Sequence, residues 1–73
     1  MIKLRISRYG IKYIYSDGVC LRIYTTGNKY WYLDGKRHRV NGLAVVWYRD
    51  GTGEWYWHGR LVTEYEYMML RGQ

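Results

Sequence analysis

The carboxylates are the first residues to consider for acid–base chemistry, and turns or a helix start account for most of them. Three of the six acidic residues are aspartates that directly precede glycine, as is typical of tight turns in which the aspartate bonds its own backbone. Glu64 and Glu66 fall in the first turn of a predicted helix. Only Glu54 remains, on a predicted strand, and one carboxylate forms no acid–base pair. The three aspartates are Asp17, Asp34 and Asp50.

The cysteine and the histidines are the other candidates for chemistry. Cys20 is expected on the solvent side of a strand beside Arg22, where a cation favours the thiolate, but the sequence places no histidine base next to it. Cys20 with His38 and His58 does not form the spaced ligand set of a metal site. The sequence therefore predicts a protein that is not an enzyme, has no metal or cofactor, and keeps a reduced thiol.

Basic residues are concentrated in the first part of the chain. The 73 residues carry a net charge of +6, and residues 1–40 hold nine lysines and arginines against two aspartates. Residues 36–39 read Lys-Arg-His-Arg, a basic loop in which His38 either contacts a phosphate or packs on a neighbouring tryptophan. A basic half attracts nucleic acid or an acidic protein surface, although on a small domain it can also serve solubility alone.

The elements that must position these groups follow a repeat of 24 residues. The pair Trp31-Tyr32 recurs as Trp55-Tyr56, and Tyr24 recurs as Tyr48. A fixed period of this size is typical of one supersecondary unit packed beside its copy. Glycines at predicted turns recur with the same offset: Gly18 with Gly42, Gly27 with Gly51, and Gly35 with Gly59.

Alternation of apolar and polar residues predicts which side of the sheet each strand residue faces. Ile2, Leu4 and Ile6 alternate with basic residues, so the first strand is expected to be half-buried with a basic outer face. One register is expected to serve both copies of the repeat, with the tryptophans in the core. The residues expected to face the core are Val19, Leu21, Ile23, Trp31 and Leu33 in the first copy, and Leu43, Val45, Trp47, Trp55 and Trp57 in the second.

The expected fold is mainly β: one domain formed by an antiparallel meander of about six strands, built from repeated hairpins, with a short C-terminal α-helix. Residues 1–17 would form a degenerate capping hairpin, residues 18–60 two hairpin repeats, and residues 61–73 the helix. Thr63 and Glu66 are spaced as in a capping box. Tyr65, Met68 and Met69 share one helix face, which is expected to pack across the sheet.

The sequence also bears on location. The longest apolar run, residues 43–48, is too short to span a bilayer. The N-terminus alternates apolar and basic residues and lacks the continuous apolar stretch of a signal peptide. A cytosolic protein is therefore expected.

An outer face rich in tyrosine is the most informative functional feature. Aromatic rings interleaved with basic side chains suit single-stranded nucleic acid, and tyrosine and arginine also anchor protein interfaces. A third interpretation is that tyrosine only pairs across strands on a solvated face, since its β-propensity is high. Lys3, Arg5 and Lys12 could extend the face. The residues assigned to it are Arg22, Tyr24, Tyr30, Tyr32, Tyr48 and Tyr56.

The motifs between Trp31 and Arg60 match a known repeat. The matching positions are Trp31-Tyr32-Leu33-Asp34-Gly35-Lys36, His38-Arg39, Asn41-Gly42 with Ala44, and Asp50-Gly51 through Trp55-Tyr56. This stretch resembles a repeat of small tailed-phage and giant-virus proteins that looks like a variant of the MORN repeat, a β-hairpin unit. Asp34 and His58 stand where asparagine is usual, and Leu43 where proline is usual. The resemblance implies a hairpin-repeat fold and a phage or mobile-element origin, and it transfers no reaction.

These observations favour a small non-enzymatic binding protein that docks on a host macromolecule and inhibits a defence or nucleic-acid-processing enzyme. The expected partner is a host protein with an acidic surface, and the expected location of the protein is the host cytoplasm. Lys36, Arg37 and Arg39 would attract that surface, with His38 in the same loop. The alternatives are a module that binds single-stranded nucleic acid through the same face, and a structural or virion component.

Overall fold

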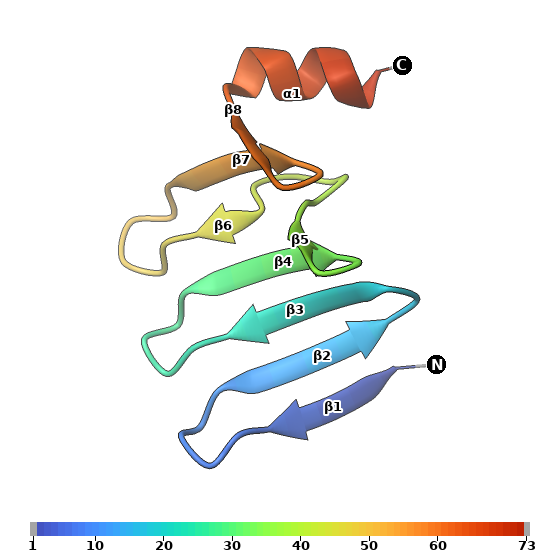
Figure 1. Cartoon of the computed structure of the whole chain (residues 1–73). Coiled ribbons are helices and arrows are strands. Elements are labelled where there is room, and N and C mark those ends of the chain that lie inside the picture. The colour runs from blue at the N-terminus through green and yellow to red at the C-terminus, as the bar shows by residue number, and fades with distance from the viewer. Residues whose placement is uncertain (1, 73) are drawn as a thin grey trace.

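The structure, a computed structural model, describes residues 2–72, and these residues form an antiparallel meander with one short helix. The mainly β fold is therefore confirmed. Along the described chain the sheet order is β1-β2-β3-β4-β6-β7-β8, and β5 pairs with β4 next to β6 (Figure 1). The elements are β1 (Lys3–Ile6), β2 (Lys12–Ser16), β3 (Val19–Ile23), β4 (Lys29–Leu33), β5 (Lys36–Arg37), β6 (Val45–Val46), β7 (Gly53–Trp57), β8 (Arg60–Val62) and α1 (Glu64–Arg71).

Residues 2–72 hold eight strands, more than the six expected, because two tight turns each add a short strand. Asp34 and His58 adopt positive φ of 50° and 48° and are each followed by a glycine with positive φ. Two successive positive φ values match the right-handed twist of a hairpin, so the chain turns back on itself within two residues. The returning segments are β5 and β8, and in Figure 1 the turns that lead into them lie at the same end of the strands.

The 24-residue period is visible in the long strands. Adding 24 to the bounds of β4, Lys29–Leu33, gives those of β7, Gly53–Trp57. Between β5 and β6 the chain makes an excursion over residues 38–44 and returns to the same edge of β4. The backbone of Trp31 is hydrogen-bonded to both end residues of this segment. Its carbonyl accepts from the His38 N–H at 3.2 Å, and its N–H donates to the Ala44 carbonyl at 2.8 Å.

The single register expected for both copies is wrong at β6. Arg22 pairs with Tyr30 in the first copy, so a shift of 24 would place Val46 opposite Glu54. Instead Val45 lies opposite Glu54, one residue out of step. A displacement of one residue turns each side chain of a strand to the other side of the sheet. Val45 therefore shares its side with Tyr30, against the expectation that it replaces Leu21.

A longer loop causes this displacement. In the first copy the Tyr24 N–H donates to the Asn28 carbonyl and closes the turn. In the second copy the closing bond runs from the Trp47 N–H to the Thr52 carbonyl, which leaves one more residue in the loop. Trp47 accordingly packs edge-on against Tyr30, with ring centres 6.0 Å apart, and not beside Trp31.

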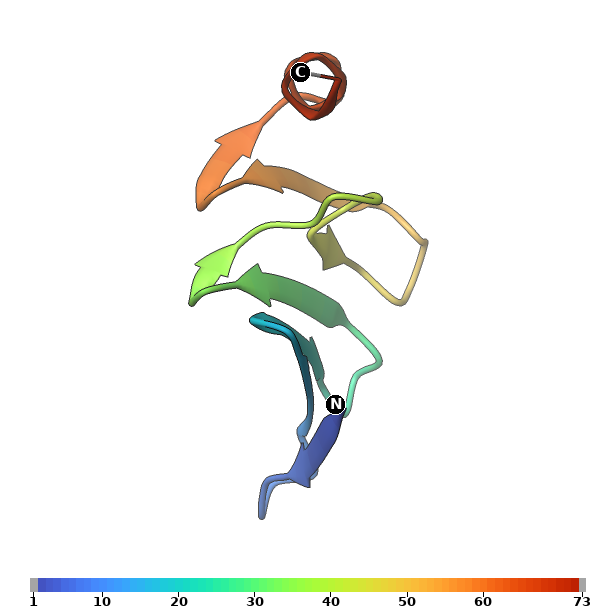
Figure 2. The same ribbon diagram turned by 90° about the vertical axis from the view of Figure 1, so that its right-hand side faces the viewer.

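The most buried residues lie around β6, β8 and α1. Among the described residues, the ones that are less than a tenth exposed are His38, Ala44, Val45, Val62 and Tyr67. The four tryptophans are half-buried around them. In Figure 2 the helix is seen end-on beyond β8, at one end of the sheet. The core therefore belongs to the C-terminal part of the molecule.

The helix has the expected capping box but begins at Glu64, because residues 61–62 belong to β8, and it packs differently from expectation. Thr63 caps it: its hydroxyl accepts from the Glu66 N–H, and the Glu66 carboxylate accepts from the Thr63 N–H, so the capping box is confirmed. The predicted stripe is wrong, because Tyr65, Met68 and Met69 are more than half exposed. Tyr67 is the buried residue instead. Its ring lies 4.6 Å from that of Trp55 and 5.8 Å from that of Trp57, centre to centre, so Tyr67 anchors α1 on the sheet.

The first strand differs from expectation as well. Ile2, Leu4 and Ile6 were expected to be half-buried, yet they are 72%, 64% and 59% exposed. No described element lies over either side of β1, β2 or β3 in Figure 2. The reason is the position of the helix, which is too short and too far along the sheet to cover them. The N-terminal part is thus a single layer that water reaches from both sides.

Candidate functional site

The strand register divides the sheet into two faces. Residues opposite one another in an antiparallel pair lie on the same face, and successive residues alternate. We call one side the Tyr–Arg face; its polar and aromatic residues are Lys3, Arg5, Tyr13, Tyr15, Cys20, Arg22, Tyr30, Tyr32, Arg37, Glu54 and Tyr56, and it also carries Val45 and Leu61. We call the other side the apolar face; its apolar residues are Leu4, Ile6, Ile14, Val19, Leu21, Ile23, Trp31, Leu33, Val46, Trp55, Trp57 and Val62, and it also carries Lys12, Ser16, Lys29, Lys36, Gly53 and Arg60.

Arg22 is at the centre of the Tyr–Arg face. Its guanidinium carbon lies 4.4 Å from the centre of the Tyr32 ring and 5.6 Å from that of Tyr13. Arg5 approaches the Tyr13 ring at the same distance of 5.6 Å. Cations at such distances are attracted to the electron-rich ring faces. The two arginines and the two rings therefore form a continuous packed row across β1 to β4.

The charge of Arg22 has no carboxylate among these neighbours. Its Nε is inaccessible to water and has no hydrogen-bond partner within residues 2–72. Burial works against the charged form, but Tyr24, Tyr32 and Cys20 together outweigh it and raise the pKa of Arg22. Arg22 is thus a half-buried cation held against tyrosine rings, and no carboxylate is among the groups that raise its pKa.

Arg37 forms a second cluster on the same face. Its guanidinium carbon lies 5.4 Å from the centre of the Tyr30 ring and 5.3 Å from that of Tyr56. Its Nη1 donates to the Tyr56 hydroxyl at 3.1 Å, and that hydroxyl lies 3.4 Å from Glu54 Oε1. The Tyr32 hydroxyl, followed by that of Tyr56, raises the pKa of Arg37. This end of the face therefore carries a carboxylate, whereas the Arg22 end does not.

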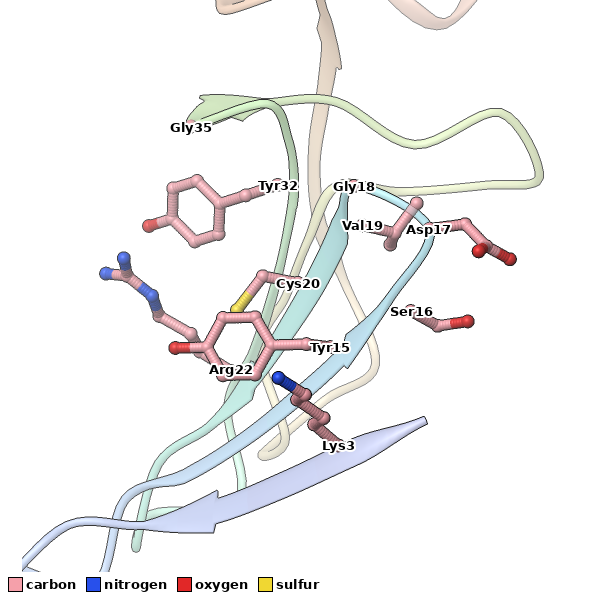
Figure 3. Close-up of a pocket in the computed structure, with 10 residues that line it drawn as sticks. All are labelled: Lys3, Tyr15, Ser16, Asp17, Gly18, Val19, Cys20, Arg22, Tyr32 and Gly35. Carbon is pink, nitrogen blue, oxygen red and sulfur yellow. The ribbon is translucent and has the colours of Figure 1, made fainter. Parts of the chain in front are cut away.

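A shallow pocket lies beside Arg22. It has a volume of about 410 Å³ and is lined by Lys3, Tyr15, Cys20, Arg22 and Tyr32, together with the turn between β2 and β3. In Figure 3 the hydroxyls of Tyr15 and Tyr32 and the guanidinium of Arg22 point to the same side, while the Asp17 carboxylate points away from them. Phenol hydroxyls, a guanidinium and an ammonium group are donors that suit a carboxylate or a phosphate. The arrangement fits binding of an anionic group better than chemistry on it.

Several residues predicted for the site do lie together on this face. Arg22, Tyr30, Tyr32, Arg37 and Tyr56 share it, as do Lys3 and Arg5. Tyr24 joins them at the end of β3, where its ring meets that of Tyr30 edge-on at 5.0 Å.

Other predicted residues lie elsewhere. Tyr48 is 72% exposed in the loop between β6 and β7, where its ring covers Gly27. Lys12 and Lys36 lie on the apolar face, opposite Ile23 and Leu33. These three residues were expected on one surface with Arg22 or Arg37, but the structure places none of them on the Tyr–Arg face.

Arg39 and His38 have structural positions. The Arg39 guanidinium lies 3.7 Å from the centre of the Trp31 ring, on the apolar face, and its Nη1 donates to the Leu43 carbonyl at 3.2 Å. His38 is 4% exposed, so the hypothesis that it contacts a phosphate is wrong. The alternative, a ring packed on a tryptophan, is correct, since His38 meets the Trp57 ring edge-on at 4.6 Å.

His38 also joins the two copies of the repeat. Its Nδ1 accepts from the His58 N–H at 2.9 Å, and the two imidazole rings stack at 4.1 Å. An accepting Nδ1 requires that this nitrogen carry no proton. Burial, and then the nearby charge of His58, lower the pKa of His38. Both effects keep the imidazole neutral near physiological pH.

Sequence reasoning missed Tyr13 and Tyr15. Both lie on β2 opposite residues of the Tyr–Arg face, Tyr13 with Arg22 and Tyr15 with Cys20. The signal was present: a two-residue turn at Asp17-Gly18 fixes the register of β2 against β3 and puts both tyrosines on the side of Arg22.

Residues 2–72 contain no group of three or more histidine, cysteine, aspartate or glutamate side chains that could hold a metal ion. The described helix is not long and apolar enough to cross a membrane. In comparisons with known proteins, the chain matches no family model, no curated protein and no solved structure.

Proposed function

We propose that this protein is a small non-enzymatic binding protein that docks through its Tyr–Arg face on an acidic surface of another protein. The observation that carries the proposal is that Arg5, Arg22 and Arg37 are held over tyrosine rings, while among residues 2–72 Glu54 is the one carboxylate of the strands on that face. Tyrosine and arginine dominate the energy of protein interfaces. Because the rings already hold the guanidinium groups in place, little side-chain entropy is lost when a partner binds.

The nature of the partner is part of the same proposal. The resemblance of residues 31–60 to repeats of small phage proteins supports a phage or mobile-element origin, and hence a host target. A host defence or nucleic-acid-processing enzyme is the class of target we propose. By covering an acidic surface of such an enzyme with its Tyr–Arg face, the protein would act as an inhibitor in the host cytoplasm.

Nucleic acid is the second candidate ligand, and the geometry favours it less. Base stacking requires ring faces that are open to the bases. Tyr13, Tyr32 and Tyr56 each have a guanidinium near the ring, and Tyr30 is additionally flanked by Tyr24 and Trp47. An oligonucleotide would have to displace these groups before stacking, whereas a carboxylate can bind the guanidinium edges where they are.

The test compares two charge-matched double variants as baits for a host lysate. The first, Arg22→Gln with Arg37→Gln, removes two charges from the Tyr–Arg face. The control, Lys29→Gln with Lys36→Gln, removes two charges from exposed positions on the other face. We expect the wild type and the control to retain the same partner, and the first variant to bind the purified partner about tenfold more weakly or worse.

Two outcomes would overturn the proposal. One is equal retention of the partner by both double variants when circular dichroism shows both to be folded. The other is tight binding of a labelled single-stranded oligonucleotide that weakens steeply with salt, as counterion release requires, and that is reduced by Tyr32→Ala. The second outcome would assign the face to nucleic acid.

A further inference from the structure

The free edge of β1 is a feature that the proposed function does not use. In the described residues β1 pairs with β2 and with no other strand. The Ser7 N–H donates to the Ile11 carbonyl at 2.8 Å, which makes these two residues a hydrogen-bonded pair in the same register. Hydrogen-bonded and non-bonded pairs alternate along an antiparallel ladder. The backbone groups of Lys3 and Arg5 therefore point toward β2, and those of Leu4 and Ile6 point outward to solvent.

The side chains of β1 give this edge two chemically different sides. Lys3 and Arg5 lie on the Tyr–Arg face, opposite Tyr15 and Tyr13. Leu4 and Ile6 lie on the apolar face and are 64% and 59% exposed. From Leu4 the apolar face continues inward through its pair with Ile14 and on to Leu21. An additional strand at this edge would find Lys3 and Arg5 on one side, and on the other the uncovered aliphatic groups of Leu4 and Ile6, with Lys12 of β2 opposite Ile6.

A second copy of the chain does not suit this edge. Antiparallel pairing of two β1 strands that keeps both faces aligned and overlaps at least three residues of each strand places Lys3 opposite Arg5 of the other copy, or Arg5 opposite Arg5. Like charges directly opposite one another destabilise a strand pair. Basic residues on an edge strand are a common protection against such self-association. The same charges become favourable if the added strand presents carboxylates at these positions.

We propose that β1 receives an extended segment of the partner as an additional strand, in which carboxylate residues alternate with aliphatic ones. The carboxylates lie opposite Lys3 and Arg5, and the aliphatic side chains lie beside Leu4 and Ile6. The outward N–H and C=O groups of Leu4 and Ile6 supply the main-chain hydrogen bonds, as in other cases of strand addition. This inference rests on the proposed function, since it names how the acidic partner attaches.

The uncovered apolar face gives the added strand a second source of affinity. Leu4 and Ile6 belong to a single layer whose apolar side is exposed to water. A further strand that shields these side chains from water lowers the free energy of the complex. Pairing also satisfies backbone groups that are otherwise bonded to water only. Charge selects the partner, and the aliphatic contacts fix its register, because a shift by one residue would set carboxylates against Leu4 and Ile6.

The probe is a capped seven-residue peptide in which glutamate alternates with valine. The matched control peptide has lysine in place of each glutamate. With wild-type protein at low salt, calorimetry should give binding of the glutamate peptide and binding about tenfold or more weaker for the lysine peptide. Amide hydrogen exchange should slow at Leu4 and Ile6 when the glutamate peptide is present, and stay unchanged at Lys3 and Arg5, whose amides are already bonded to β2.

A variant tests the backbone directly. Leu4→Pro removes an outward N–H and leaves the bonds from β1 to β2 in place, so it should abolish peptide binding. Leu4→Ala, which keeps the N–H, should weaken binding by a few-fold at most. The exchange measurement on the wild type decides the matter if Leu4→Pro does not fold.

The outcomes separate this inference from the proposed function. Peptide binding that leaves exchange at Leu4 and Ile6 unchanged but is lost in the Arg22→Gln, Arg37→Gln variant would overturn strand addition and retain docking by the Tyr–Arg face. Failure of the glutamate peptide to bind would also overturn strand addition, with docking judged by the lysate experiment. A concentration-dependent dimer that Leu4→Pro dissociates would assign the edge to a second copy and overturn the inference.

Discussion

The two ends of the sheet differ in how much of their side-chain surface is buried. At the C-terminal end, Tyr67 of α1 packs on Trp55 and Trp57 on one side of the sheet and Val45 is buried on the other, so this end holds the fully buried residues. At the N-terminal end, β1, β2 and β3 form a layer with water on both sides, and Arg5 and Arg22 lie on one of these sides. A chain of 73 residues buries too little surface to cover both ends. Stability is therefore concentrated in one half, and the other half stays exposed; it is to this exposed half that our proposal assigns most of the recognition.

Removal of the Tyr67 ring tests this division most severely. Tyr67→Ala should lower the free energy of unfolding by about 4 kcal/mol, because a fully buried ring that contacts Trp55 and Trp57 is lost. Tyr67→Phe should cost about 1–2 kcal/mol, because the hydroxyl accepts from the Gly42 N–H at 2.9 Å and donates to the Val40 carbonyl. Urea denaturation followed by tryptophan fluorescence measures both. A loss below 1 kcal/mol for the alanine variant would contradict the placement of the core.

The close contact between β6 and β7 gives the next largest effect. A Cβ added to Gly53 would lie 1.8 Å from the Val45 carbonyl oxygen, which is backbone and cannot rotate away. Gly53→Ala should therefore cost about 3 kcal/mol, since one of the two strands must move. Gly35→Ala is a useful comparison, because its added Cβ meets no atom and only its positive φ of 82° opposes the change. Equal losses for the two variants would argue against the register of β6.

Acid should destabilise the protein through His38. The pKa of His38 is lowered in the folded state, so between that pKa and the usual value of 6.5 the unfolded chain binds a proton that the folded chain does not. Stability should be constant above about pH 7 and fall as the pH drops below 6.5. Urea midpoints between pH 7.5 and 5.5 measure the slope. His38→Gln should flatten the profile, whereas His58→Asn should remove only part of the slope, because burial is the larger cause.

The smallest effect on stability is expected at the open end. Leu4→Ala should change the free energy of unfolding by less than about 0.5 kcal/mol, since its side chain is 64% exposed. Val45→Ala removes less volume and should cost about 2 kcal/mol, because Val45 is 0% exposed. The same denaturation measurement compares the two. A larger loss at Leu4 than at Val45 would reverse the assignment of the two ends.

Local patterns were sufficient to predict the long strands and the turns between them. Pairs such as Asp17-Gly18 and Asp34-Gly35 specify their own backbone conformation, so they are readable without any long-range information. The displacement of β6 was not readable in the same way. The glycines Gly27 and Gly51 keep the 24-residue offset, while the hairpin closes one residue earlier, at Trp47. The spacing between turn glycines therefore does not determine the register of the strand that precedes each glycine.

The candidate site was predicted where the strands are regular and missed where they stop. Period-two alternation correctly groups Arg22 with Tyr30 and Tyr32. It fails for Arg39, because the chain leaves the sheet after Arg37 and the excursion over residues 38–44 has no alternation. Tyr67 was missed for a related reason: its partners Val40 and Gly42 belong to that excursion, 27 and 25 residues away. Contacts of this kind depend on the assembled fold.

The stacked imidazoles of His38 and His58 lie at the junction of successive units, and this has a consequence for engineering. The helix closes the sheet beyond β8, so the protein cannot be lengthened there without losing Tyr67. Whole 24-residue modules inserted after β5 would leave both edges of the sheet as they are. The length of the sheet would then follow from the number of modules, and modules copied from the first repeat, which holds Arg22 and Arg37, would also extend the Tyr–Arg face.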